Sequence, residues 1–284
     1  MSIERVGIVG GGLMGSGIAE VSAKAGVDVI VHEVNSEFAE GTLARIEKSL
    51  GRAVEKGKLD EQGRQQIMGR INMTTDLSEM ADRQLVVEAV TENEDLKKEI
   101  FGRLDDIVSD EDAILASNTS SIPITRLAAS TSRADHVVGM HFFSPVPVMA
   151  LMELVTTVMS DSGVEDRAQA FAEQIGKTVI RAKDRAGFVV NMLLVPYWLG
   201  AIRMYEAGVA SKEDIDTGMK LGANHPMGPL ELADFVGLDV AKFVADVLFE
   251  EYKEPLYASP PLLTRMVEAG LLGRKTGQGF YNYD

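Results

Sequence analysis

Acid–base chemistry in this chain depends on few side chains, because its 284 residues include four histidines and no cysteine. His141 ends the apolar run 137–140, and Glu153 is the one acidic residue of the otherwise apolar run 151–155. A buried carboxylate is costly unless it is paired, and a histidine is a natural partner whose ring the carboxylate would orient. Such a pair can remove a hydroxyl proton while hydride leaves the adjacent carbon. The two residues are therefore candidates for a dehydrogenation that needs no metal.

Structural interpretations of these residues stay open. A single histidine beside an apolar run is more often a core residue whose hydrogen bonds are satisfied, and Glu153 could form a salt bridge with an arginine or lysine. The remaining histidines are less well placed for chemistry. His136 starts its run, His32 lies within an earlier run, and His225 precedes a proline in a turn.

Three more polar residues occupy positions where a ligand could bind. Ser117 begins the polar segment 117–121 directly after the apolar run 113–116, and its hydroxyl could hold a substrate oxygen or belong to a polar turn or helix cap. Asn191 is the lone polar residue of 188–194 and could meet a substrate carbonyl or a neighbouring backbone group. Glu92 follows the run 85–89 and could face a coenzyme.

A glycine-rich segment predicts the coenzyme. Gly10-Gly11-Gly12-Leu13-Met14-Gly15 fits G-x-G-x-x-G between a short apolar run and a helical pattern. Such glycines permit a tight turn, the approach of a pyrophosphate and close packing of the helix, whose N-terminus offers free N–H groups. Glu33, 18 residues after Gly15, could accept hydrogen bonds from ribose hydroxyls and would repel a 2′-phosphate. We therefore expect NAD rather than NADP, the alternative being a structural turn beside a surface glutamate. The expected contacts are Gly10, Gly12, Leu13, Met14, Gly15 and Glu33.

The elements that position these residues alternate between strands and helices. The pattern of the first 33 residues predicts a strand, a glycine turn, a helix and a second strand. This order is a βαβ unit of a parallel sheet. Residues 36–70 are charged and predict two helices, broken near Gly57 and inserted between strands. Further strands are expected at 71–74, 85–89, 113–116, 136–141, 151–155 and 178–181, and helices near 93–107 and 164–175. This order predicts an α/β fold with a Rossmann-type doubly wound sheet over residues 1–185.

The pattern changes near Lys183-Asp184-Arg185, where strand signals end and long helical stretches begin. An all-α C-terminal domain is therefore expected over residues 186–284. Its first stretch, 186–202, contains Asn191 and Pro196 and is shorter than the roughly 20 residues that span a bilayer. We interpret this stretch as a buried helix.

Composition limits the classes of partner. Lys plus Arg total 28 and Asp plus Glu total 43, which gives a net charge of −15. That balance argues against nucleic-acid binding and against docking on anionic membranes. We expect no signal peptide and no membrane span, and the absence of cysteine excludes disulfides and thiolate chemistry. A cytoplasmic location is the resulting expectation.

Several long motifs in one order resemble the 3-hydroxyacyl-CoA dehydrogenase family, and within it the short-chain bacterial 3-hydroxybutyryl-CoA dehydrogenases. The resemblance covers essentially the whole chain. The motifs that carry it, besides the glycine turn, are Val87-Glu88-Ala89-Val90, Ser117-Asn118-Thr119-Ser120-Ser121, His141-Phe142-Phe143, Met219-Lys220-Leu221-Gly222-Ala223 and Lys275-Thr276-Gly277.

The resemblance implies NAD-dependent oxidation of a short-chain (3S)-3-hydroxyacyl-CoA, such as 3-hydroxybutyryl-CoA, to the 3-oxoacyl-CoA, and the reverse reduction. It implies that His141 is the catalytic base with Glu153 as its partner, and that the helical domain forms a homodimer. The positions that match NAD contacts of the family are Glu33, Glu92, Lys97, Ser117, Ser144 and Lys275. Those that match contacts with coenzyme A or the acyl group are Ser49, Lys56, Ser117, Ser144 and Asn191.

Two departures from the family pattern leave other functions open. Ser144 stands where the family usually has asparagine, and Ala186 where it usually has proline. A nucleotide-binding relative without catalysis is one alternative, and Ser144 is its only support. A dehydrogenase of free 3-hydroxy acids is another, but such enzymes typically use a lysine on the first long helix of the second domain. No lysine occurs between Gly187 and Glu206.

Overall fold

The computed structural model describes residues 2–283, which form two compact units divided between Arg185 and Ala186. Each unit has its own hydrophobic core. We call the first the sheet unit and the second the helical unit. Across residues 2–283, no helix is both long enough and apolar enough to cross a membrane.

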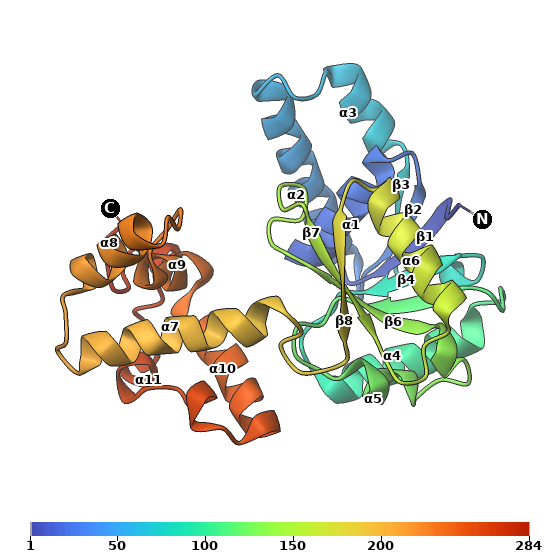
Figure 1. Ribbon diagram of the computed structural model, residues 1–284. Helices are drawn as coiled ribbons and strands as arrows, with labels where there is room; N and C mark the ends of the chain where they lie inside the picture. Colours follow the sequence, from blue (N-terminus) through green and yellow to red (C-terminus); the bar gives the residue numbers. More distant parts are fainter. Residues whose placement is uncertain (1, 284) are drawn as a thin grey trace. The chain divides into compact units, whose positions relative to one another are not determined.

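The sheet unit is built on one eight-stranded sheet with the strand order β3-β2-β1-β4-β5-β6-β7-β8. Strands β1 to β6 run parallel, β7 pairs antiparallel with β6, and β8 runs parallel to β7. The strands are β1 (Arg5–Val9), β2 (Asp28–His32), β3 (Ile71–Thr74), β4 (Leu85–Glu88), β5 (Ile114–Ser117), β6 (Val137–Phe142), β7 (Leu151–Thr156) and β8 (Thr178–Lys183). Helices flank this sheet (Figure 1), which confirms the predicted Rossmann-type α/β fold.

A helical hairpin interrupts the sheet between β2 and β3, as the sequence predicts. The helices of the unit are α1 (Leu13–Lys24), α2 (Ser36–Glu55), α3 (Glu61–Met68), α4 (Glu94–Ile107), α5 (Ile124–Ala128) and α6 (Ser162–Gln174). We call α2 and α3 the helical arm, which Figure 1 shows projecting beyond the sheet. Asn35 and Asp60 cap the two helices by accepting backbone hydrogen bonds, and Gly57, at φ +67°, provides the left-handed turn between them.

The central strands β4, β5 and β6 are buried at every position. This is the pattern of a parallel sheet that is covered on both faces. Three polar side chains at or near the carboxyl ends of these strands therefore lie inside the protein: Glu88, Ser117 and His141.

The strands expected between residues 85 and 181 shift at their boundaries by one or two residues, and two of these shifts concern polar residues discussed above. The strand expected at 136–141 runs from Val137 to Phe142, because His136 closes a short 3-10 turn before it. The strand expected at 113–116 runs from Ile114 to Ser117, so that Ser117 ends the strand instead of following it. Both residues have side chains that also suit turns, and the sequence gives no sign of which structure prevails.

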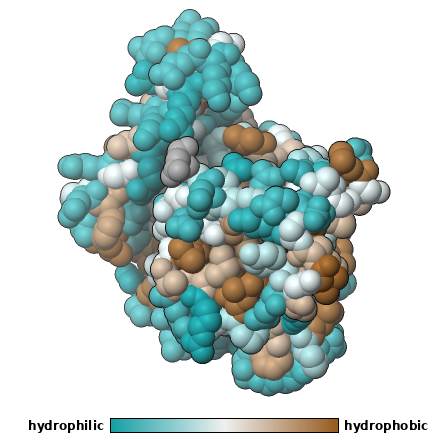
Figure 2. All heavy atoms as spheres, turned by 90° about the vertical axis from the view of Figure 1, so that its left-hand side faces the viewer, coloured by the Kyte–Doolittle hydropathy of each residue, from teal (hydrophilic) through white to brown (hydrophobic). Residues whose placement is uncertain are grey.

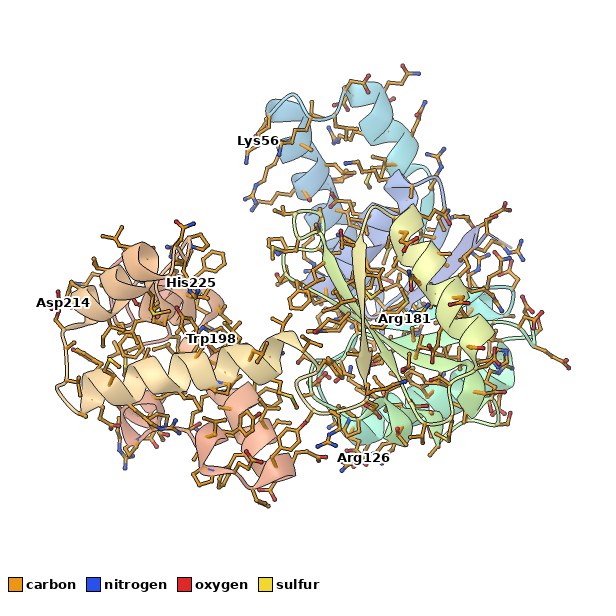
Figure 3. All side chains as sticks on the ribbon, viewed as in Figure 1. Lys56, Arg126, Arg181, Trp198, Asp214 and His225 are labelled. Carbon is orange, nitrogen blue, oxygen red and sulfur yellow. The ribbon has the colours of Figure 1, made fainter. Side chains whose placement is uncertain are left out.

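The helical unit consists of α7 (Val190–Glu206), α8 (Lys212–Gly222), α9 (Pro229–Val236), α10 (Leu238–Tyr252) and α11 (Pro261–Glu268). The buried helix expected at 186–202 begins only at Val190, because Gly187 and Phe188 adopt positive φ values. It is not buried along its whole length, since Leu193 is 72% exposed. Trp198, labelled in Figure 3, lies on α7 within the core of this unit. Within residues 2–283 its indole N–H has no hydrogen-bond partner.

Candidate active site

The carboxyl ends of β1, β2, β4 and β5 form one edge of the sheet, and the glycine turn directly follows β1. Gly10 has φ +93°, a left-handed conformation that favours glycine. A Cβ atom on Gly15 would lie 1.8 Å from the carbonyl oxygen of Gly10, so helix and strand approach too closely for a side chain. A Cβ atom on Gly12 would instead meet nothing within 4 Å, so this side of the turn is open.

The open side of the turn suits the pyrophosphate of a dinucleotide. α1 starts at Leu13, and no side chain caps its first N–H groups. A helix N-terminus of this kind attracts an anion through its free donors and its dipole. Glu33 follows β2 and holds the turn, because its Oε1 accepts a hydrogen bond of 2.7 Å from the N–H of Gly11. These residues therefore fit NAD, with a carboxylate at the strand end where ribose hydroxyls bind.

His141 and Glu153 lie directly opposite each other on the antiparallel strands β6 and β7. Side chains at such paired positions share one face of the sheet, about 5 Å apart at Cβ. The Nδ1 atom of His141 lies 2.6 Å from Oε2 of Glu153, and the two residues are 6% and 0% exposed. An ionised carboxylate can only accept, so Nδ1 carries the proton that is donated to Glu153. Proton exchange with a ligand then falls to the other ring nitrogen, Nε2.

A second buried carboxylate, Glu88 at the end of β4, was not among the predicted site residues. Its Oε1 accepts hydrogen bonds from Nζ of Lys97 at 2.6 Å and from the N–H of Val90 at 2.7 Å. Its Oε2 accepts from the hydroxyl of Ser117 at 2.6 Å. The rule that singles out Glu153, an acid within an apolar strand, would also have found Glu88.

This cluster determines what Ser117 and Lys97 can do. Ser117 is fully buried, and its oxygen also accepts a hydrogen bond from the N–H of Thr119. Lys97 is 1% exposed and forms ion pairs with both Glu88 and Glu92. Both predicted ligand contacts therefore belong to an internal network at the carboxyl ends of β4 and β5.

Glu92 lies at the outer side of the same network. Its carboxylate accepts hydrogen bonds from the hydroxyls of Thr119 and Ser121. Burial alone would raise the pKa of Glu92, but the Lys97 ammonium and these hydroxyls together outweigh burial and lower it. Glu92 is therefore held ionised at neutral pH, beside the end of β4.

Asn118 joins this network to the histidine. Its Oδ1 accepts a hydrogen bond of 3.0 Å from the N–H of Phe142, the residue after His141, while its own N–H donates to the carbonyl of Glu88. β4, β5 and β6 are thus tied together at the edge where the candidate residues lie.

The remaining predicted residues lie elsewhere. Ser144 is exposed in the loop after β6. Ser49 lies about two-thirds of the way along α2, and Lys56, labelled in Figure 3, is exposed directly after the outer end of this helix. Asn191 and Lys275 belong to the helical unit, where Asn191 is in the first turn of α7 and Lys275 pairs with Asp239 at 2.5 Å.

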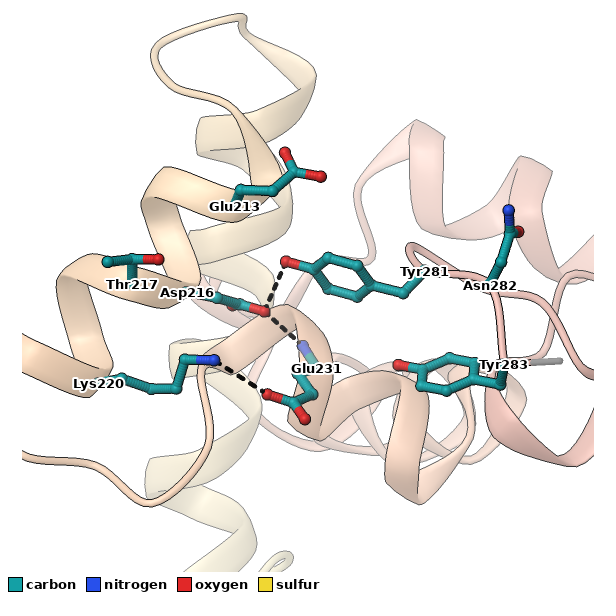
Figure 4. A pocket seen from close by; sticks show the side chains of 8 residues that line it. All are labelled: Glu213, Asp216, Thr217, Lys220, Glu231, Tyr281, Asn282 and Tyr283. Atoms are coloured by element: carbon teal, nitrogen blue, oxygen red, sulfur yellow. Dashed lines mark hydrogen bonds and ion pairs between the residues drawn. The ribbon is translucent and has the colours of Figure 1, made fainter.

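Two cavities provide further candidate sites. One of about 290 Å³ lies between α1 and α2 and is lined by Leu13, Ser16, Arg45, Lys48, Ser49 and Arg52, among others. The other, of about 370 Å³, lies in the helical unit (Figure 4). There Asp216 accepts hydrogen bonds from the Tyr281 hydroxyl and from the N–H of Glu231, each at 2.9 Å. Because this carboxylate ties α8 to α9 and to the C-terminal segment, its evident role is structural.

Metal binding has no candidate in the part of the chain that the structure describes. No three residues among its histidines, aspartates and glutamates are placed to hold an ion together. The arrangement instead offers a coenzyme turn, a buried histidine–carboxylate pair and a network of fixed charges on one sheet.

Comparison with known proteins assigns this arrangement to a family. Residues 5–185 match the family model of the 3-hydroxyacyl-CoA dehydrogenase NAD-binding domain, and residues 187–283 match that of the C-terminal domain. A 3-hydroxybutyryl-CoA dehydrogenase of Mycobacterium tuberculosis is 56% identical over 99% of both chains. The crystal structure of M. tuberculosis FadB2 is likewise 56% identical, with a TM-score of 0.98 over all of both chains. That of (S)-3-hydroxybutyryl-CoA dehydrogenase from Ralstonia eutropha is 46% identical, with a TM-score of 0.95 and the same coverage. The chain therefore belongs to the 3-hydroxyacyl-CoA dehydrogenase family.

Proposed function

We propose that this protein interconverts a short-chain (3S)-3-hydroxyacyl-CoA, 3-hydroxybutyryl-CoA first among them, and the corresponding 3-oxoacyl-CoA with NAD. The observation that carries the proposal is the 2.6 Å contact of His141 with Glu153, buried in the same sheet that bears the glycine turn. The relatives named for this activity support the choice of substrate.

In this proposal His141 moves the proton. In the oxidation direction Nε2 removes the proton of the 3-hydroxyl group, and in the reduction it returns that proton to the oxygen. Glu153 holds the ring in one tautomer and stabilises the imidazolium that forms. The chemistry that NAD supplies when bound is acceptance of a hydride from the hydroxyl-bearing carbon.

The network around Glu88 has a supporting part. It fixes the ends of β4 and β5, so that Ser117 and Glu92 keep their positions at the carboxyl ends of the strands, where the coenzyme is proposed to bind. We retain Glu92, Lys97, Ser144 and Lys275 as proposed coenzyme contacts on the family resemblance. Ser117 and Asn191 are retained on the same ground as proposed contacts with the reacting part of the substrate.

The cavity between α1 and α2 has a lining that suits an anionic substrate carrier. Arg45, Lys48 and Arg52 lie on one side of α2 at spacings of three and four residues, together with Ser49. Glu20 lines the same cavity, and burial raises its pKa more than the nearby Ser49 and Lys24 lower it. A raised pKa makes that acid easier to protonate, which is the direction that lessens its conflict with a phosphate. We assign this cavity and Lys56 to coenzyme A.

The experiment that tests the proposal follows NADH absorbance with acetoacetyl-CoA, with free acetoacetate as the comparison substrate. We expect turnover of the CoA ester that exceeds turnover of the free acid by at least about 100-fold, because the free acid lacks the carrier's binding energy. Equal rates would point to a dehydrogenase of free acids. NADH binding without turnover of any acyl chain length would point to a relative that has lost catalysis.

We also propose a homodimer formed through the helical unit, in a cytoplasmic enzyme. Several large apolar side chains of this unit are exposed, among them Leu193, Leu221, Phe235 and Phe243. Figure 2 shows such apolar residues scattered over its face, whereas the end of the helical arm is mostly hydrophilic. Sedimentation of the full chain tests the dimer, since replacing Phe243 with a charged residue should yield monomers.

A further inference from the structure

Three glycines stand together in the coenzyme turn, but a dinucleotide requires only the first and the third of them. The G-x-G-x-x-G pattern leaves position 11 unrestricted. In the structure, a Cβ atom on Gly11 would lie 2.3 Å from Oγ1 of Thr42, a fully buried residue of α2. The helical arm therefore packs directly against the middle of the turn, at a distance that only glycine permits.

Side chains of the arm also bind the backbone of this glycine. The hydroxyl oxygen of Thr42 lies 2.9 Å from the carbonyl oxygen of Gly11, and the guanidinium of Arg45 donates to the same carbonyl at 3.0 Å. Arg45 also donates to the Thr42 hydroxyl at 3.2 Å. Since the Gly11 N–H donates to Glu33, both backbone polar groups of Gly11 are bound by side chains. The turn and the base of α2 therefore form one hydrogen-bonded unit.

The same arginine lines the cavity that we assign to coenzyme A. Leu13 and Ser16 of α1 line that cavity on one side. Arg45, Ser49 and Arg52 of α2 line it on the other. One residue, Arg45, thus contacts the coenzyme turn and borders the second ligand's pocket.

We infer that Arg45 is a positioning residue that couples the two ligands, so that occupation of the arm by coenzyme A strengthens NADH binding at the turn. This inference rests on the proposed function. A ligand that orders the arm also orders the turn, because Arg45 and Thr42 connect them. The second ligand then binds with a smaller loss of conformational entropy. The coupling is positive and reciprocal: each ligand raises the affinity of the other by the same factor.

The test measures NADH binding to the full-length protein by NADH fluorescence, with and without saturating free coenzyme A. Free coenzyme A carries the phosphates but no acyl group, so no turnover occurs. For the native protein we expect the Kd of NADH to fall at least about fivefold when coenzyme A is present. The Kd of coenzyme A should fall by the same factor when NADH is present.

The variants separate coupling from binding. Arg45→Met should bring the coupling factor close to one, and Arg45→Lys, which keeps one donor, should give an intermediate value. Arg52→Met should weaken coenzyme A binding and leave the factor unchanged. Arg64→Met is the matched control, because Arg64 lies on the same arm and pairs with Glu61 instead of the turn.

The outcomes distinguish the inference from the function on which it rests. Coenzyme A binding that leaves the Kd of NADH unchanged would overturn the coupling and leave the proposed function intact, as would full coupling in Arg45→Met. A failure of coenzyme A to bind at millimolar concentration would contradict both the inference and the assignment of the cavity.

Discussion

Two acidic residues, Glu88 in β4 and Glu153 in β7, occupy equivalent environments in one sheet and meet different partners. Both are fully buried, and each is the one charged residue of its strand. Glu88 pairs with the ammonium of Lys97, while Glu153 pairs with the imidazole of His141. A lysine ordinarily keeps its charge at neutral pH, whereas an imidazole gains and loses a proton there. The partner therefore decides whether a buried carboxylate holds the structure or can take part in proton transfer.

The largest effect is expected at the histidine. In His141→Gln the amide can still donate to Glu153, but it cannot accept the substrate proton. We expect kcat to fall by about 10²- to 10⁴-fold, while the Kd of NADH changes less than about threefold. Steady-state kinetics with acetoacetyl-CoA and NADH titration provide the two readouts. An unchanged kcat would remove His141 from the mechanism.

Removal of Lys97 should act mainly on stability, because its ammonium forms ion pairs with Glu88 and Glu92. In Lys97→Met the fully buried Glu88 loses its cation, and we expect the free energy of unfolding to fall by about 3–5 kcal/mol. The double variant Glu88→Gln/Lys97→Met should recover most of this loss, because no unpaired charge then stays buried. Urea unfolding followed by circular dichroism measures both.

A neighbouring lysine supplies the control for that prediction. Lys98 pairs with Glu94 on the protein surface, where its side chain is 37% exposed. Lys98→Met should therefore cost no more than about 1 kcal/mol. A similar loss of unfolding free energy in Lys97→Met and Lys98→Met would show that the buried pair of Glu88 with Lys97 contributes no more than a surface pair.

Neutralising each carboxylate in turn should further distinguish the role of Glu153 in catalysis from that of Glu88 in stability. Glu153→Gln keeps an acceptor for the His141 N–H and removes the charge that stabilises an imidazolium, so we expect kcat to fall about 10- to 100-fold. In Glu88→Gln the Lys97 ammonium stays buried, and the part-exposed Glu92 is then its one charged partner among residues 2–283. Its main effect should therefore be a lower unfolding midpoint. The comparison fails if Glu88→Gln impairs kcat as much as Glu153→Gln while its stability is native.

The smallest effect concerns pH. The pKa of Glu92 is lower in the folded protein than in the unfolded chain, where it is about 4.3. Its contribution to stability is fully present above the unfolded value and is lost as the pH falls through the lower folded value. Glu92→Gln should thus cost up to about 1 kcal/mol at pH 7, the scale of a part-exposed pair. The difference from the native protein should shrink toward pH 3 in acid-unfolding curves, and a difference that grew would contradict this assignment.

Local sequence predicted the parts of the site that are formed by neighbouring residues. The glycine turn is such a part, because three glycines, one helix start and one strand end lie within 15 residues. The candidate pair of His141 and Glu153 could be named because each is a polar residue in an apolar run. Their exact opposition could not, since it depends on β7 running antiparallel to β6 with one particular register.

Other parts depend on contacts between distant elements. Lys97 reads as an ordinary charged residue of α4, and only the packing of that helix brings it to Glu88. Gly11 and Arg45 are 34 residues apart, so the contact of the arm with the turn has no local signal. The late start of α7 depends on the positive φ of Phe188, a conformation that its sequence does not favour.

The distribution of aromatic residues has an optical consequence. Trp198 is the only tryptophan, and all six tyrosines also lie beyond residue 186, so the sheet unit contains neither residue type. Excitation of tryptophan therefore occurs only in the helical unit. NADH bound at the glycine turn of the other unit would accept that excitation energy. The native chain, without any added label, thus carries a donor and a coenzyme acceptor whose transfer efficiency reports the separation of its two units in solution.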